Sequence, residues 1–224
     1  MQREFAWKKE QKGTGQLFIL VKQQKRSLLI AFSLVAGCTG SIYTLFSYMP
    51  TYCKLYLNLS LTEAYLGAAV GILVSILTIP FFGALSDRIG KKIIMLCALA
   101  CYFGLIYPLL FLLNQHPGVS ILILVESILG LCIGAYFGVL TITVSSLFPP
   151  SIRSTCLAVS YNSAIMLFGG FAPFIITALI EYTKNPMVFT YYQMTTVSIS
   201  LMAVLSYQEE RETSEHHREH LVAI

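Results

Sequence analysis

Charged residues are scarce in this chain of 224 residues: aspartate, glutamate, lysine and arginine together make up 12% of it, whereas hydrophobic residues make up 56%. A soluble domain carries about 25% charged and about 45–50% apolar residues. This shortage of charge and the mean hydropathy of +0.70 exclude a water-soluble protein and indicate a membrane protein. The formal net charge of +4 then reports membrane topology, so we expect no nucleic-acid partner.

Catalytic and cofactor motifs are also lacking. The chain contains no G-x-S-x-G, no H-E-x-x-H and no glycine-rich phosphate loop. Its four histidines are His116 and three in the segment 215–220, which is expected to be a solvated tail and not a metal site. The six cysteines form no C-x-x-C pair, and most lie in apolar runs, which favours packing over disulfides or metal ligands. We therefore expect neither an enzyme nor a bound cofactor or metal.

We expect no secretory signal peptide, because residues 1–26 are polar and basic. The length sets a second limit. Each membrane-spanning helix needs about 20 apolar residues, so twelve spans would need about 240 residues before any loop. The chain has 224 residues and accommodates six such helices with short loops.

Six long apolar runs are present, and they predict an all-α membrane protein. They are about twice the length of a barrel strand and do not alternate in polarity, so helices are expected. Only one residue within them is formally charged, Glu126, as hydrocarbon demands. The predicted spans are Leu28–Met49, Ala64–Leu85, Ile93–Leu113, Ile121–Leu147, Cys156–Ile180 and Met187–Tyr207.

Lysine and arginine predict the orientation of these helices. Thirteen of the 15 lie in segments on one side of the predicted membrane, and only Lys54 and Lys184 lie on the other. By the positive-inside rule, both termini are expected in the cytoplasm of a plasma or inner membrane. The predicted organisation is a cytoplasmic connector over residues 1–26, a six-helix bundle over 27–207 and a charged cytoplasmic tail over 208–224.

The loop after the second run carries a spaced pattern, G-x-x-x-D-R-x-G-K-K. The first glycine allows close helix packing, the second allows a tight reversal, and the two lysines suit an anionic lipid surface. The aspartate suits a helix N-terminus or an arginine. An ordinary basic loop would explain the lysines but not the spacing. The residues are Gly83, Asp87, Arg88, Gly90, Lys91 and Lys92.

This loop resembles the signature loop of the major facilitator superfamily, which recurs in each six-helix half and acts there as a cytoplasmic gate. Later stretches resemble the second half of the metabolite:proton symporter family, whose members carry proline/betaine, α-ketoglutarate, citrate or shikimate. The stretches are Pro50-Thr51-Tyr52, Phe148-Pro149-Pro150-Ser151-Ile152-Arg153, Tyr161-Asn162 and Phe168-Gly169-Gly170-Phe171-Ala172-Pro173. The resemblance covers roughly residues 20–207.

The resemblance implies a proton-coupled transporter of a small metabolite, with Arg153 joining the gate residues. The proline/betaine type fits best, and a carboxylate carrier is the alternative. No predicted span contains lysine or arginine, which favours a zwitterion unless the missing half supplies the positive charge. One departure concerns the acidic residue that the family often has before the Phe-Pro pair. This chain has Ser145, Ser146 and Leu147 there, which puts any gate contact made by that carboxylate in doubt.

The fourth run combines a glycine stripe with an acid. Gly130, Gly134 and Gly138 recur every four residues and predict close helix packing. Glu126 lies one turn before this stripe. An intramembrane carboxylate is a candidate for proton or cation coupling. The alternative is a carboxylate hydrated at the outer interface.

The first and fifth runs hold further candidates for a substrate path. Thr39 and Tyr43 lie at helical spacing in the first, where aromatic rings suit a quaternary ammonium group. Abundant interfacial tyrosine is the alternative. The fifth contains Asn162 and the helix-weakening residues Gly169, Gly170 and Pro173. These predict either a broken helix at a binding site or a kink used for packing.

The main expectation is that the chain is the C-terminal six-helix half of a transporter, whose partners are lipid, protons, substrate and a missing N-terminal half. Three fates are open: a split carrier with a separately encoded first half, a self-associating bundle, or an inactive truncated remnant. Co-expression with a matching first half would distinguish the first from the last.

Overall fold

The computed structural model describes residues 24–207, and in that range it contains helices and no strand. Six helical segments are long and apolar enough to cross a membrane: Lys25–Tyr56, Leu61–Ile89, Lys91–Gln115, Val119–Ser146, Arg153–Thr183 and Val188–Ser206. The prediction of an all-α protein with six membrane-spanning helices is confirmed. The predicted tail at 208–224 and nearly all of the predicted connector lie outside the described residues.

Two of the six spans are interrupted by a π-helical turn. Span one consists of α2 (Lys25–Ile42), η1 (Tyr43–Tyr48) and α3 (Met49–Tyr56). Span five consists of α7 (Arg153–Ala164), η2 (Ile165–Gly170) and α8 (Ala172–Thr183). The other spans are the continuous helices α4 (Leu61–Ile89), α5 (Lys91–Gln115), α6 (Val119–Ser146) and α9 (Val188–Ser206).

The largest difference from the predicted spans is at the end of span one. The apolar run predicted an end at Met49, but the helix continues to Tyr56. Pro50 lies in the first turn of α3, where its missing N–H is tolerated. The π turn of η1 immediately precedes it, so the proline follows an existing irregularity and does not end the helix.

Local signals explain where the long helices begin and reverse. Ser60 and Glu63 form a capping box at the start of α4, in which Glu63 N donates to Ser60 Oγ over 3.2 Å and Ser60 N donates to Glu63 Oε2 over 2.9 Å. Gly90 has φ 104°, a left-handed conformation that favours glycine, and it is the single residue between α4 and α5.

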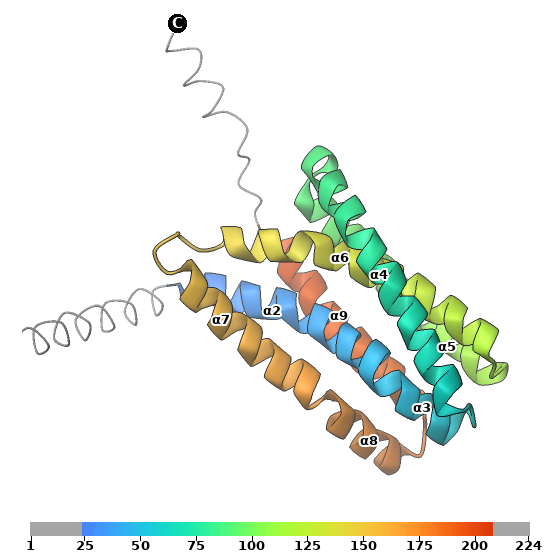
Figure 1. Cartoon of the computed structure of the whole chain (residues 1–224). Coiled ribbons are helices and arrows are strands. Elements are labelled where there is room, and N and C mark those ends of the chain that lie inside the picture. Colours follow the sequence, from blue (N-terminus) through green and yellow to red (C-terminus); the bar gives the residue numbers. More distant parts are fainter. Residues whose placement is uncertain (1–23, 208–224) are drawn as a thin grey trace, which may run out of the picture.

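The spans form two layers. In the first layer α4 packs along α6, α6 contacts α2, and α2 packs against α7 and η2. In the second layer α5 contacts α6 and α9, and α9 lies along α2 and touches α8. Figure 1 shows α7 and α2 side by side with α9 beyond them, and α4 crossing α6. The two spans at the ends of the first layer, α4 and span five, are the least buried of the six.

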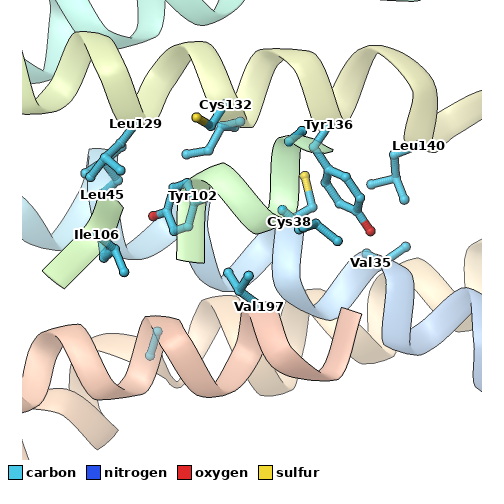
Figure 2. Packing of buried hydrophobic residues seen from close by; sticks show 14 of the residues in the cluster. Val35, Cys38, Leu45, Tyr102, Ile106, Leu129, Cys132, Tyr136, Leu140 and Val197 are labelled. Atoms are coloured by element: carbon cyan, nitrogen blue, oxygen red, sulfur yellow. The ribbon is translucent and has the colours of Figure 1, made fainter. Parts of the chain in front are cut away.

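The core lies where α2, α5, α6 and α9 converge. Figure 2 shows Cys38, Tyr102, Cys132, Tyr136 and Val197 meeting there. Tyr136 Oη donates to the Leu34 carbonyl oxygen over 2.9 Å, which joins α6 to α2. Large apolar side chains are also abundant on the outside, as expected of a surface in lipid. On α4 they include Leu73, Ile76, Leu77 and Phe81.

Candidate functional site

The loop pattern at 83–92 spans the end of α4 and the start of α5. Asp87 and Arg88 are exposed in the last turn of α4, and within residues 24–207 neither has a hydrogen-bond or ion-pair partner. Lys91 is half-buried at the start of α5. The aspartate and the arginine are therefore available to a partner outside the described bundle.

Lys92 has a role that the sequence did not indicate. Its Nζ donates to the carbonyl oxygens of Leu205 (3.1 Å) and Tyr207 (2.6 Å), at the C-terminal end of α9. That end has no basic residue of its own in its last turn. Since the last carbonyls of a helix lack intrahelical donors, Lys92 caps α9 from the neighbouring helix α5, whereas the sequence suggested an anchor on the lipid surface.

Arg153, the remaining predicted gate residue, begins α7. Its Nε donates to the Phe148 carbonyl oxygen over 3.1 Å and so braces the turn between α6 and α7. The side chain is half-buried. The structure therefore places Arg153 in a contact within the bundle, separate from the exposed Asp87 and Arg88.

The glycine stripe of α6 faces α4. A Cβ atom added at Gly130 would lie 2.6 Å from the Gly71 carbonyl oxygen, and one at Gly138 would lie 2.5 Å from the Ile79 carbonyl oxygen. At Gly134 it would collide with Thr78 Oγ1. Backbone and short side chains of α4 therefore fill the space where larger residues on α6 would project.

Two other glycines do not show the close packing expected of them. A Cβ at Gly83 would make only ordinary contact, 3.6 Å from the Gly138 carbonyl oxygen. At Gly170 the nearest atom would be the Ile165 carbonyl oxygen of the same turn, at 3.8 Å. Neither position requires glycine for a close helix approach. Pro173 lies in the first turn of α8, directly after η2, where it does not disrupt the helix.

Glu126 is fully buried, with 0% of its surface exposed. Neither carboxylate oxygen has a hydrogen-bond partner in the described part of the chain. The side chain lies against Gly71 of α4, where an added Cβ would be 2.9 Å from Oε2. Since an ionised carboxylate buried without a partner costs several kcal/mol, this site is suited to hold a proton and does not fit the alternative of a hydrated interfacial acid.

Thr39 and Tyr43 of span one lie against the π turn η2 that interrupts span five. Gly169 of η2 lies so close that an added Cβ would be 2.8 Å from both Thr39 Cγ2 and Tyr43 Cδ2. Thr39 is buried, whereas Tyr43 is 36% exposed. Asn162 is exposed on α7. The structure thus brings Thr39, Tyr43 and Gly169 together, whereas among the described residues no hydrogen bond joins them to Glu126 or Asn162.

The sequence analysis missed a buried polar pair between α5 and α9. Tyr102 Oη donates to Gln193 Oε1 over 2.6 Å, and both side chains are buried. Gln193 Nε2 has no partner within the described residues, nor has Thr190 Oγ1 one turn away. An amide inside an apolar run is a usable signal, as it was for Asn162, because buried polar groups need partners.

Comparisons with known proteins agree with this architecture. Residues 28–220 match the Major Facilitator Superfamily. The citrate-proton symporter of Klebsiella pneumoniae is 27% identical over 183 residues, which cover 82% of this chain and 41% of that protein. The ectoine/proline transporter ProP of Corynebacterium glutamicum is 30% identical over 83% of this chain and 37% of its own length.

The proline/betaine transporter of Escherichia coli (strain K12) is 28% identical over 185 residues, or 82% of this chain and 36% of that protein. The chain thus spans about two fifths of the length of the curated relatives that it matches. These relatives are named as transporters, which agrees with the prediction of a protein that is not an enzyme. With six apolar helices and a match over most of its length, this integral membrane protein belongs to the Major Facilitator Superfamily.

Proposed function

We propose that this chain forms the C-terminal six-helix lobe of a proton-coupled symporter that takes up a small zwitterion such as proline or betaine. One observation carries the proposal: the similarity to an ectoine/proline transporter and a proline/betaine transporter covers 83% and 82% of this chain. A second six-helix lobe would supply the part of those relatives that this chain does not match.

The packing supports a two-lobe arrangement. In the most apolar stretches of α4 and span five, only 17% and 28% of the residues are buried, against 44% or more in the other spans. These two spans flank the first layer, so a second lobe docking on that layer would cover both edges. Asp87 and Arg88, which have no partner in the described residues, lie at the end of α4 where they would face it.

The substrate class follows from what the helices offer. The described lysines and arginines lie near helix ends or in loops, so no cation is placed mid-helix to bind a carboxylate. Tyr43 presents a partly exposed ring beside Thr39, and such a ring suits a quaternary ammonium group. A carboxylate carrier is the second candidate, because relatives in Klebsiella pneumoniae and Salmonella typhi are named citrate-proton symporters.

Proton coupling is assigned to Glu126, the buried carboxylic group without a partner. A proton taken up on one side of the membrane would reside there while the two lobes rock about a central site. Glu126→Gln should abolish proton-driven uptake while leaving exchange of substrate, because the neutral amide mimics one protonation state only. Unchanged proton-driven uptake in this variant would remove Glu126 from the mechanism.

The test of transport is uptake of labelled betaine by cells that lack their own carrier, with the chain expressed alone or with a matching N-terminal six-helix lobe. We expect uptake only with the second lobe, and loss of uptake when a protonophore dissipates the proton gradient. Competition by citrate but not by proline would favour the carboxylate alternative. No uptake with any partner lobe would favour an inactive remnant.

We further propose that residues 27–207 form the membrane bundle, and that the connector 1–26 and the tail 208–224 are cytoplasmic at the inner membrane. The excess of lysine and arginine on one side of the predicted spans supports this orientation. A reporter that is active only in the cytoplasm should be active when fused after Ile224. Activity only on the outer side would contradict the topology.

A further inference from the structure

The buried carboxylic group of Glu126 lies inside the contact between α4 and α6. An added Cβ at Gly71 would be 2.9 Å both from the Glu126 carbonyl oxygen and from its Oε2. One turn further along, Ser75 Oγ donates to the Gly130 carbonyl oxygen over 2.7 Å. The acid therefore occupies one position in a row of small residues along which the two helices touch.

This row is the principal attachment of α4 to the rest of the bundle. Helix α6 is its main neighbour along its length, whereas α3, η1 and α5 make smaller contacts with it. Much of the remaining surface of α4 is exposed, including Leu77 and Phe81. A change in the contact with α6 would therefore act chiefly on the position of α4.

The close contact favours the protonated state of the acid. Neither oxygen of Glu126 has a hydrogen-bond donor within the described residues, and no water-exposed surface remains. A neutral carboxylic group tolerates such a site far better than an ionised one. Loss of the proton would therefore favour separation of the helices, because separation would admit water to the carboxylate.

We propose that protonation of Glu126 sets the spacing between α4 and α6 and thereby the position of the 83–92 loop at the end of α4. The proton comes from bulk water and forms an O–H bond on the carboxylate, which draws α4 onto α6. Its release has the opposite effect. This inference rests on the proposed symport function, and Gly71 acts in it as a positioning residue.

Other titratable groups around Glu126 do not provide a competing switch. Cys53 of α3 and Tyr102 of α5 are near enough to interact with it electrostatically, but both are neutral at physiological pH. On α4 there is no titratable side chain between Tyr65 and Asp87. Glu126 is thus the one acid in the described bundle interior whose titration falls within this contact.

The experiment measures the helix spacing as a function of pH. Spin labels are placed on the exposed positions Phe81→Cys of α4 and Ile142→Cys of α6 in the full chain in lipid nanodiscs. Exposed Cys97 and Cys101 are replaced by serine so that they do not compete for the label. The carboxylic-acid carbonyl band in the infrared spectrum is followed in the same samples.

We expect the distance between the labels to lengthen as pH rises, with the same midpoint as the loss of the infrared band. In Glu126→Gln the distance should stay short at every pH, and in Gly71→Ala it should be longer at every pH. Glu181→Gln, which alters an exposed acid of α8, should respond like the unmodified chain.

The proposal would be overturned if the distance between the labels in the wild-type chain did not change while the infrared band titrates. It would also be overturned if that distance still lengthened with pH in the Glu126→Gln variant. The wild-type titration decides the question even if a variant does not fold. Proton-driven uptake by the two-lobe transporter, found together with a spacing that does not respond to pH, would refute this inference alone. A normal change in spacing with uptake independent of protons would refute the symport proposal instead.

Discussion

The ammonium group of Lys92 lies 2.6 Å from the carbonyl oxygen of Tyr207, so the start of α5 holds the end of the last described helix. The two residues are 115 positions apart in the chain. The contact gives the second lysine of the loop pattern a defined partner within the bundle.

Replacing Lys92 by methionine should loosen this end of α9. The variant keeps the apolar stem but loses two charge-assisted hydrogen bonds, and we expect the free energy of unfolding to fall by about 1–2 kcal/mol. Amide hydrogen exchange at Ala203 to Tyr207 should become faster. Lys54→Met is the control, because Lys54 is exposed. If amide exchange in the Lys92→Met variant were as slow as in the unmodified chain, the assignment of Lys92 as a cap would be contradicted.

A methyl group at Gly134 should disrupt the contact between α4 and α6. The added Cβ would collide with Thr78 Oγ1 and lie 2.6 Å from the Ser75 carbonyl oxygen, so we expect Gly134→Ala to destabilise the bundle by about 1–3 kcal/mol. Thermal unfolding in detergent measures the loss. Gly104→Ala on α5 is the matched control, since no heavy atom lies within 4 Å of its added Cβ and the change should be neutral or stabilising.

Removing the hydroxyl of Tyr102 should leave a buried acceptor unsatisfied. Tyr102→Phe deprives Gln193 Oε1 of its donor, while Nε2 already has none in the described residues, and we expect a loss of about 1–3 kcal/mol. In the double variant Tyr102→Phe with Gln193→Leu, no polar group of the pair remains. Its loss of stability should be smaller than the sum of the two single losses, and a strictly additive cycle would argue against coupling.

The ring of Tyr43 is predicted to contribute to substrate affinity. Tyr43→Leu should raise the KM for betaine uptake by the two-lobe transporter roughly tenfold, as expected for loss of a cation–π contact of about 1–2 kcal/mol. Tyr43→Phe keeps the ring and should retain most of the affinity. Tyr182→Leu serves as a control because Tyr182 is 89% exposed on α8. Equal KM values for the leucine and phenylalanine variants at position 43 would exclude the ring from binding.

The six spans were predictable because each needs a long apolar run, and lipid excludes charge from it. The ends of the spans were less predictable. Polar residues such as Ser60 with Glu63 extend α4 by capping, and the helix of span one passes through Pro50 to Tyr56. The glycines and proline near η2 indicated a weakened helix. The π turn η1 contains neither glycine nor proline, and it was not predicted.

The candidate site was predictable only where a residue contrasts with its own segment. Glu126 stands out as an acid in an apolar run, and its roles in proton binding and helix spacing remain predictions. Lys92 with Tyr207, and Tyr102 with Gln193, are pairs separated by 115 and 91 positions. Such pairs depend on how the helices are arranged around each other, and periodicity within one helix does not reveal that arrangement.

The π turns of η1 and η2 bear on how these helices should be probed. A helical wheel advances about 100° per residue, but a π turn closes its hydrogen bond one residue later than an α turn does. Faces assigned by that wheel in α2 and α7 therefore do not carry over to α3 and α8. A cysteine-accessibility scan along either span should show its periodicity change phase once, within Tyr43–Tyr48 in span one and within Ile165–Gly170 in span five.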